Sequence, residues 1–192
     1  MSICSSCMAE VPAGEEVLVA GKNRREPNAI LCANCASTVE QALEAETKDP
    51  NLPVAILLGI VAAIAGGLIW YAIVALTNYQ LGIVAVGIGY LVGVAVLFGA
   101  GKKRGPALQA IAVVITLIAM VVGEYFVVRH FAVKALAEEG TTGIPLLLPF
   151  KAMSELVVIG VKEDPITLLY WAIALFAAFS VPGRRRLRRV KA

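Results

Sequence analysis

The sequence predicts a mainly α-helical protein, a four-helix transmembrane bundle with a small N-terminal α+β finger. Three observations support this fold class. Hydrophobic residues make up 59% of the 192-residue chain and charged residues only 16%, whereas soluble domains are usually about 45–50% apolar and about 25% charged. The apolar residues are concentrated in four long segments after residue 50, and all four cysteines precede residue 36. We therefore expect lipid to surround most of the chain.

The cysteines form two close pairs, Cys4-x2-Cys7 and Cys32-x2-Cys35, separated by 24 residues. Two such pairs can place four thiolates around one point, which is the tetrahedral arrangement that structural zinc prefers. Iron is the chemical alternative, because softness and geometry alone also admit it. Four thiolates leave no open coordination position, so the spacing predicts a structural Zn²⁺ site and no catalytic one.

The residues between and after the pairs predict the shape of a domain spanning residues 1–50. Residues 15–20 and 28–31 have strand patterns, and the turn-like segment 21–27 between them completes a β-hairpin. Residues 33–47 are rich in helix formers, with Ala36, Val39 and Leu43 on one side. This order of cysteine knuckle, hairpin and helix resembles a treble-clef or zinc-ribbon finger.

The transmembrane domain is expected to span residues 51–182. A helix needs about 20 mostly apolar residues to cross a hydrocarbon core, and backbone groups in lipid must be bonded within the segment. The last segment is short, but tilt or local thinning can accommodate it. The predicted spans are residues 53–76, 81–100, 107–128 and 166–182.

The distribution of charge predicts the orientation of these spans. Lys102, Lys103 and Arg104 form a purely basic loop, and the tail, residues 183–192, has six bases and no acid. Because basic loops stay on the cytoplasmic side, both termini and this loop should be cytoplasmic. The first apolar segment begins too late for a cleaved leader, so we expect it to remain as an anchor.

Small residues recur every fourth position in two spans and are expected to pack helices closely. They are Gly59, Ala63 and Gly67 in the first span, and Ala85, Gly89 and Gly93 in the second. In the outer connection, residues 151–162 are expected to form a short interfacial helix, whereas residues 144–150 suit either an interfacial or a re-entrant segment.

The remaining candidates concern lipid and ion contacts. Glu124 is expected near the outer end of the third span, where it can reach the interface or pair with Arg129, and intramembrane acids are also candidates for proton or ion transfer. The sequence lacks a triad, a carboxylate pair and a phosphate loop, so we expect no enzyme. The acidic finger also argues against nucleic-acid binding. The bases expected to contact anionic lipid headgroups are Lys102, Lys103, Arg104, Arg184, Arg185, Arg186, Arg188 and Arg189.

Residues 82–96, GIVAVGIGYLVGVAV, are followed by a basic Gly-rich loop and by LQAIAV at residues 108–113. This pattern is similar to bacterial multi-span membrane proteins that carry an N-terminal zinc-ribbon or B-box-like finger and have no assigned activity. The resemblance implies a bacterial inner membrane. The expected role is an adaptor or accessory subunit with a protein partner or a second copy of itself. The alternative is a small transporter or channel that uses Glu124, Asn78 and Gln80.

Overall fold

The computed structural model describes residues 2–12, 14–20, 28–79, 82–138, 150–163, 165–185 and 187. The chain divides into two compact units. One is Met1–Asp49 together with Arg184–Ala192, which we call the finger unit, and the other is Pro50–Gly183, which we call the bundle. The C-terminal tail therefore groups with the N-terminal finger although the whole bundle separates them in sequence.

Two small hairpins and one helix build the finger. Strands β1 (Ser2–Ile3) and β2 (Glu10–Val11) pair antiparallel, and so do β3 (Val17–Val19) and β4 (Ala29–Leu31). The second hairpin confirms the prediction, whereas the first was not predicted. Segment 21–27, the expected turn, lies outside the described residues.

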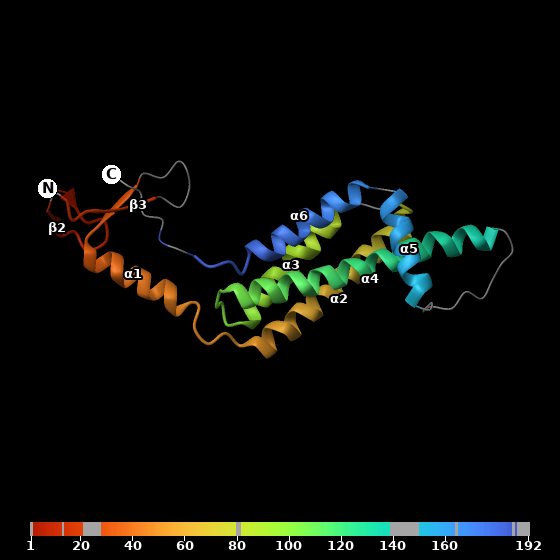
Figure 1. The fold of residues 1–192 in the computed structure, drawn as a ribbon, viewed down its shortest axis with the longest axis horizontal. Helices are drawn as coiled ribbons and strands as arrows, with labels where there is room; N and C mark the ends of the chain where they lie inside the picture. Colours follow the sequence, from red (N-terminus) through yellow and green to blue (C-terminus); the bar gives the residue numbers. More distant parts are fainter. Residues whose placement is uncertain are drawn as a thin grey trace. The chain divides into compact units, whose positions relative to one another are not determined.

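The finger helix α1 (Ala33–Ala45) is attached to the hairpins mainly through its first turn. Ala36 is buried with Cys4, Val11 and Leu31 in a small core, whereas Val39, one turn further on, is 38% exposed. The predicted apolar side of this helix is therefore buried only at its N-terminal end, and the rest of α1 extends beyond the hairpins (Figure 1).

Five helices make up the bundle, and four of them run antiparallel along one another (Figure 1). Helices α3 and α4 each contact both of the outer helices, α2 and α6, while α5 packs against α4. The N-terminus of α2 is capped by the Asn51 side chain, which accepts from the Val54 amide. The helices are α2 (Leu52–Thr77), α3 (Ile83–Gly99), α4 (Pro106–Glu138), α5 (Phe150–Glu163) and α6 (Ile166–Ser180).

Two helices in the described residues, and not four, are long and apolar enough to span a membrane. They are α2 with 26 residues and α4 with 33, whereas α3 and α6 have only 17 and 15. The predicted second and fourth spans were too long because they included apolar flanking residues that form turns, such as Ala100 and Val181. The third was too short, because α4 continues ten residues beyond Val128.

The small residues of α3 lie where its backbone approaches α6. A methyl group added at Gly89 would overlap the carbonyl group of Ala174, and one at Gly93 would lie 3.1 Å from the Val181 Cβ. In α2 the prediction was only partly right, because Gly59 and Gly66 contact neighbouring helices while Gly67 has open space around its Cβ position. A strict four-residue repeat drifts around a helix of 3.6 residues per turn, so the packed face passes from Gly59 to Gly66.

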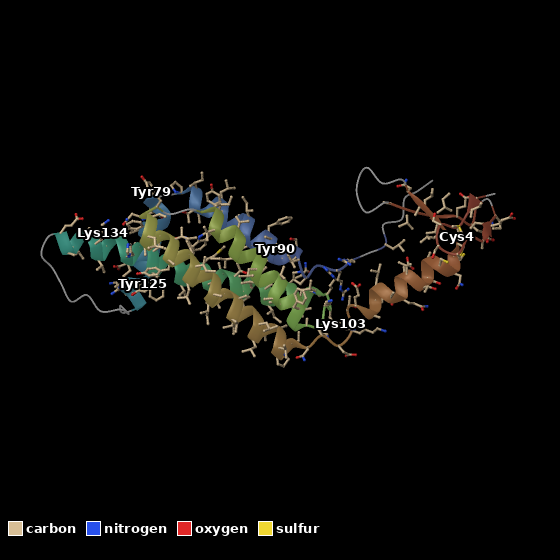
Figure 2. The ribbon with its side chains drawn as sticks, turned by 180° about the vertical axis from the view of Figure 1, so that it is seen from behind. Cys4, Tyr79, Tyr90, Lys103, Tyr125 and Lys134 are labelled. Atoms are coloured by element: carbon tan, nitrogen blue, oxygen red, sulfur yellow. The ribbon has the colours of Figure 1, made fainter. Side chains whose placement is uncertain are left out.

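Hydrogen bonds hold the two ends of the bundle. At one end Arg104 Nη1 donates to the carbonyls of Val181 (2.7 Å) and Gly183 (3.2 Å). At the other end Lys134 Nζ donates to the Asn78 side-chain oxygen across 2.9 Å. Figure 2 shows Lys103 and Lys134 at these opposite ends. The basic loop, the start of α2 and the end of α6 therefore share one end of the bundle.

The outer connection is described only in part. Helix α5 agrees with the predicted helix at residues 151–162. Residues 144–149, for which an interfacial or re-entrant segment was predicted, lie outside the described residues, and so does Gln80.

Candidate metal centre

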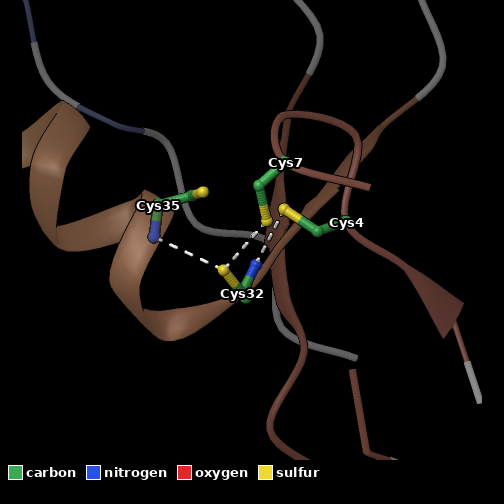
Figure 3. Close-up of side chains that lie close together, drawn as sticks. All are labelled: Cys4, Cys7, Cys32 and Cys35. Atoms are coloured by element: carbon green, nitrogen blue, oxygen red, sulfur yellow. Dashed lines mark hydrogen bonds between the residues drawn. The ribbon is translucent and has the colours of Figure 1, made fainter. Parts of the chain in front are cut away.

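Each cysteine pair occupies a tight local turn next to a strand. Cys4 and Cys7 lie in the turn between β1 and β2, whereas Cys32 follows β4 directly and is the N-cap of α1. Cys35 lies in the first helical turn, as predicted. The side chains of all four converge on one point between the two hairpins and the helix (Figure 3).

The sulfur positions fit a metal ion. All four sulfur atoms lie within 4.8 Å of one another, and those of Cys7 and Cys32 are 3.8 Å apart. A tetrahedral site with metal–sulfur bonds of about 2.3 Å has sulfur–sulfur edges of about 3.8 Å. The cluster therefore needs only a small contraction to coordinate one ion with four thiolates.

Backbone amides orient the sulfur atoms and link the two cysteine pairs. The Cys32 amide donates to the Cys4 sulfur at 3.3 Å, and the Cys35 amide donates to the Cys32 sulfur at 3.5 Å. The Ser5 amide also donates to the Ile30 carbonyl at 2.8 Å, which ties the first turn to β4. The bonds from Cys32 to Cys4 and from Ser5 to Ile30 join segments 25 or more residues apart in sequence. The two bonds to sulfur stabilise negative charge there.

The thiols differ in acidity. Hydrogen bonds from the backbone of Cys7, and then of Cys32 and Ser6, lower the pKa of Cys4 to about 6. The hydrogen bond with the Cys32 side chain, followed by that with Cys7, raises the pKa of Cys35 to about 12 in the metal-free site. Cys4 is thus ready to bind a cation at neutral pH, whereas Cys35 must lose a proton when a metal binds.

The arrangement suits a structural metal. Four soft sulfur donors complete a tetrahedral coordination shell and leave no position for a reacting water molecule. The core beneath the site is small, with Cys4 itself fully buried. A unit of this size depends on such a crosslink for its stability. Among the described residues these four form the one group that meets the geometric requirements of a metal site.

Glu124 lies in a different environment from the predicted one. It was expected close to the interface, but its side chain is fully buried between the helices. At the neighbouring Gly123, the ring of Trp70 lies 2.7 Å from where a Cβ would be. Thr116, eight residues earlier in α4, is also fully buried, and its hydroxyl has no hydrogen-bond partner in the described part of the chain. Two polar side chains of α4 are therefore buried inside the bundle, with the buried Met120 between them, which sequence reasoning did not find.

The predicted lipid-contacting bases have different surroundings. Lys102, Arg184 and Arg185 are exposed, Lys103 is half-buried, and Arg104 holds the carbonyls at the end of α6. A role for these residues at lipid headgroups stays a prediction. The other three bases, Arg186, Arg188 and Arg189, lie outside the described residues.

Comparisons with protein-family models, with curated proteins and with solved structures find no match to this chain. The resemblance to bacterial multi-span proteins with a B-box-like finger therefore stays a prediction.

Proposed function

We propose that this chain is an integral membrane adaptor, in which a four-span bundle holds a structural zinc finger at the cytoplasmic membrane surface for docking a protein partner. The observation that carries the proposal is the closed four-sulfur cluster, joined in one chain to an apolar bundle. A site without an open position has a structural role, and a stable small domain is suited to protein contacts.

The outward faces of the bundle support the four-span arrangement. Large apolar side chains are exposed on the two short helices as well as the long ones, including Phe176 (70%) and Leu169 (57%) on α6 and Leu68 (65%) on α2. Soluble proteins rarely expose apolar patches of this extent. With about 1.5 Å per residue, the 17 residues of α3 reach about 26 Å, so turns at its ends and local thinning complete the crossing.

The shared end of the bundle supports the proposed orientation. The start of α2, Arg104 and the end of α6 lie together, which fits an even number of crossings with both termini on one side. The basic loop that contains Arg104 favours the cytoplasmic side for this end of the bundle. We propose a bacterial inner membrane as the setting.

The first experiment measures metal content and partner retention in the same purified sample. We expect one zinc per chain by mass spectrometry, and no zinc after Cys32→Ser with Cys35→Ser. A stoichiometric partner cross-linked to the finger in native membranes should be absent from this variant. The matched control is Ser5→Ala, an exposed serine next to the ligands. Iron in place of zinc would correct the metal, and a partner retained by the zinc-free variant would contradict the docking role.

A second candidate function has one specific observation in its favour, the complete burial of Glu124 inside the bundle. Buried acids in membrane helices often carry protons or ions. A transporter or channel predicts cation or proton flux into proteoliposomes that is abolished by Glu124→Gln and kept by the exposed-end variant Glu138→Gln. Equal flux with both variants would exclude this role for Glu124.

A further inference from the structure

The C-terminal tail is part of the finger's packing. Leu187 packs against the core formed by Cys4, Val11, Leu31 and Ala36, and it contacts this core together with the ligand residues Cys32 and Cys35. Leu187 is half-buried although its neighbours in the sequence are arginines. A single apolar residue inside a basic segment therefore inserts into a domain that begins more than 180 positions earlier.

A groove lies between the tail and α1. It has a volume of about 380 Å³, with Arg184, Arg185 and Leu187 on the tail side. The residues on the helix side are Glu40, Leu43, Glu44 and Thr47. Two acids and an apolar side chain on α1 thus face two bases and an apolar side chain on the tail, so charge and polarity are complementary across the groove.

Positive charge near the C-terminal end of α1 would stabilise this helix. Its last turn contains no basic residue, while Glu44 lies in that turn and Glu46 is the C-cap. The C-terminal end of a helix carries partial negative charge, which acids worsen and nearby cations relieve. Arg184 and Arg185 line the same groove as Glu44 and so bring positive charge to this end of the helix.

We propose that the face of α1 formed by Glu40, Leu43, Glu44 and Thr47 is a docking surface for a basic segment with the pattern Arg-Arg-x-Leu, and that Arg184, Arg185 and Leu187 of this same chain are its resident occupants. The tail therefore completes the finger instead of extending freely. The inference requires a folded finger but does not require the adaptor role.

The tail's occupancy limits what else can bind there. A partner that docks on this face of α1 must carry a similar basic and apolar segment and must displace residues 184–187. The same arginines are also attracted to anionic headgroups, which would compete with the groove. Binding measurements therefore use zwitterionic nanodiscs, in which this competition is absent.

The test uses the full chain loaded with zinc and a fluorescein-labelled peptide of residues 184–192, RRRLRRVKA. In the wild type the resident tail should keep binding weak. The tail variant Arg184→Glu, Arg185→Glu, Leu187→Asp should release the groove, and fluorescence anisotropy should then show saturable one-to-one binding at least tenfold tighter. A labelled peptide with Asp in place of Leu187 should bind at least tenfold more weakly than the native peptide.

Two further variants locate the binding site. Added to the tail variant, Glu40→Lys with Glu44→Lys should weaken peptide binding at least tenfold. The charge-matched control Glu10→Lys with Glu15→Lys changes exposed acids that do not line the groove, and it should keep the affinity within about twofold. Zinc content is measured for each, and Glu40→Gln with Glu44→Gln replaces the lysine pair if that pair loses zinc. Equal binding to wild type and tail variant, or equal weakening by groove and control variants, would overturn the proposal.

Discussion

The backbone amide of Cys32 donates a hydrogen bond to the sulfur of Cys4 across 3.3 Å, so that the first cysteine pair is positioned by the second before any metal binds. This bond is one of those that lower the pKa of Cys4, and the same cluster raises the pKa of Cys35. The two shifts have opposite consequences for metal binding.

The apparent zinc affinity should depend on pH in two regimes. Cys35, with its pKa raised to about 12, is protonated at every pH from 5 to 9. Zinc must displace this proton, so the zinc affinity falls about tenfold for each unit by which the pH falls. Cys4, with its pKa lowered to about 6, is already ionised above pH 7. Protons compete with zinc for its sulfur only when the pH falls to about 6 or below. A plot of log affinity against pH should therefore steepen by about one as pH falls from 7 to 5.

This pH profile is measured by competition with a chromogenic chelator on the full chain in detergent. Cys4→Ser removes the ligand responsible for the change of slope, so its weaker affinity should follow a straight line through pH 6. A wild-type plot without steepening would show that the Cys4 thiol is not the acidic member of the cluster.

The knuckle between Cys4 and Cys7 ends in a conformation that disfavours its present residue. Met8 has a φ of +61° and is 76% exposed. A left-handed conformation costs an L-residue about 1–2 kcal/mol, whereas glycine adopts it readily. Met8→Gly should therefore raise the finger's stability by about 1 kcal/mol and tighten zinc binding several-fold in the same chelator assay. Met8→Ala is the control and should give no gain.

The contact between α3 and α6 should tolerate no added atoms. Gly89→Ala places a methyl group against the Ala174 carbonyl, and overpacking of this kind costs about 1–3 kcal/mol. Gly87→Ala, in the same helix but with open space around its Cβ position, should be neutral or slightly stabilising. Denaturation in mixed micelles, followed by the fluorescence of the two tryptophans, measures both. Equal loss in the two variants would contradict the packing argument, because helix propensity favours alanine over glycine at both positions.

Arg104 should slow the hydrogen exchange of backbone amides at the end of α6. Its guanidinium donates to two carbonyl oxygens, and a charged hydrogen bond contributes about 1.5–3 kcal/mol. Arg104→Ala should speed hydrogen exchange in the last turn of α6 by roughly 10- to 100-fold, while Lys102→Ala, which changes an exposed base of the same loop, should leave it unchanged. Unaltered exchange after Arg104→Ala would show that the other bonds at this end suffice.

Sequence reasoning succeeded where local pattern determines structure. The spacing of Cys4, Cys7, Cys32 and Cys35 alone predicted one cluster, and the alternation before Cys32 predicted the β3–β4 hairpin, because both depend on residues close to the ligands. The β1–β2 hairpin has only two residues on each strand, too few to produce a recognisable period.

The remaining errors have long-range causes. Apolar residues continue past the ends of α3 and α6, so hydropathy alone cannot show where these helices end. The burial of Glu124 depends on how α4 packs against the other helices of the bundle. The place of Leu187 in the finger core depends on a contact between the two ends of the sequence. None of these relationships is visible within a window of neighbouring residues.

The bonds that Arg104 makes to the end of α6 join residues 77 positions apart, and this separation has a kinetic consequence. Contacts between distant residues form slowly, because a long loop must close before they contribute. Helix α6, the fifth helix of the bundle, should consequently be the last to dock as the protein assembles.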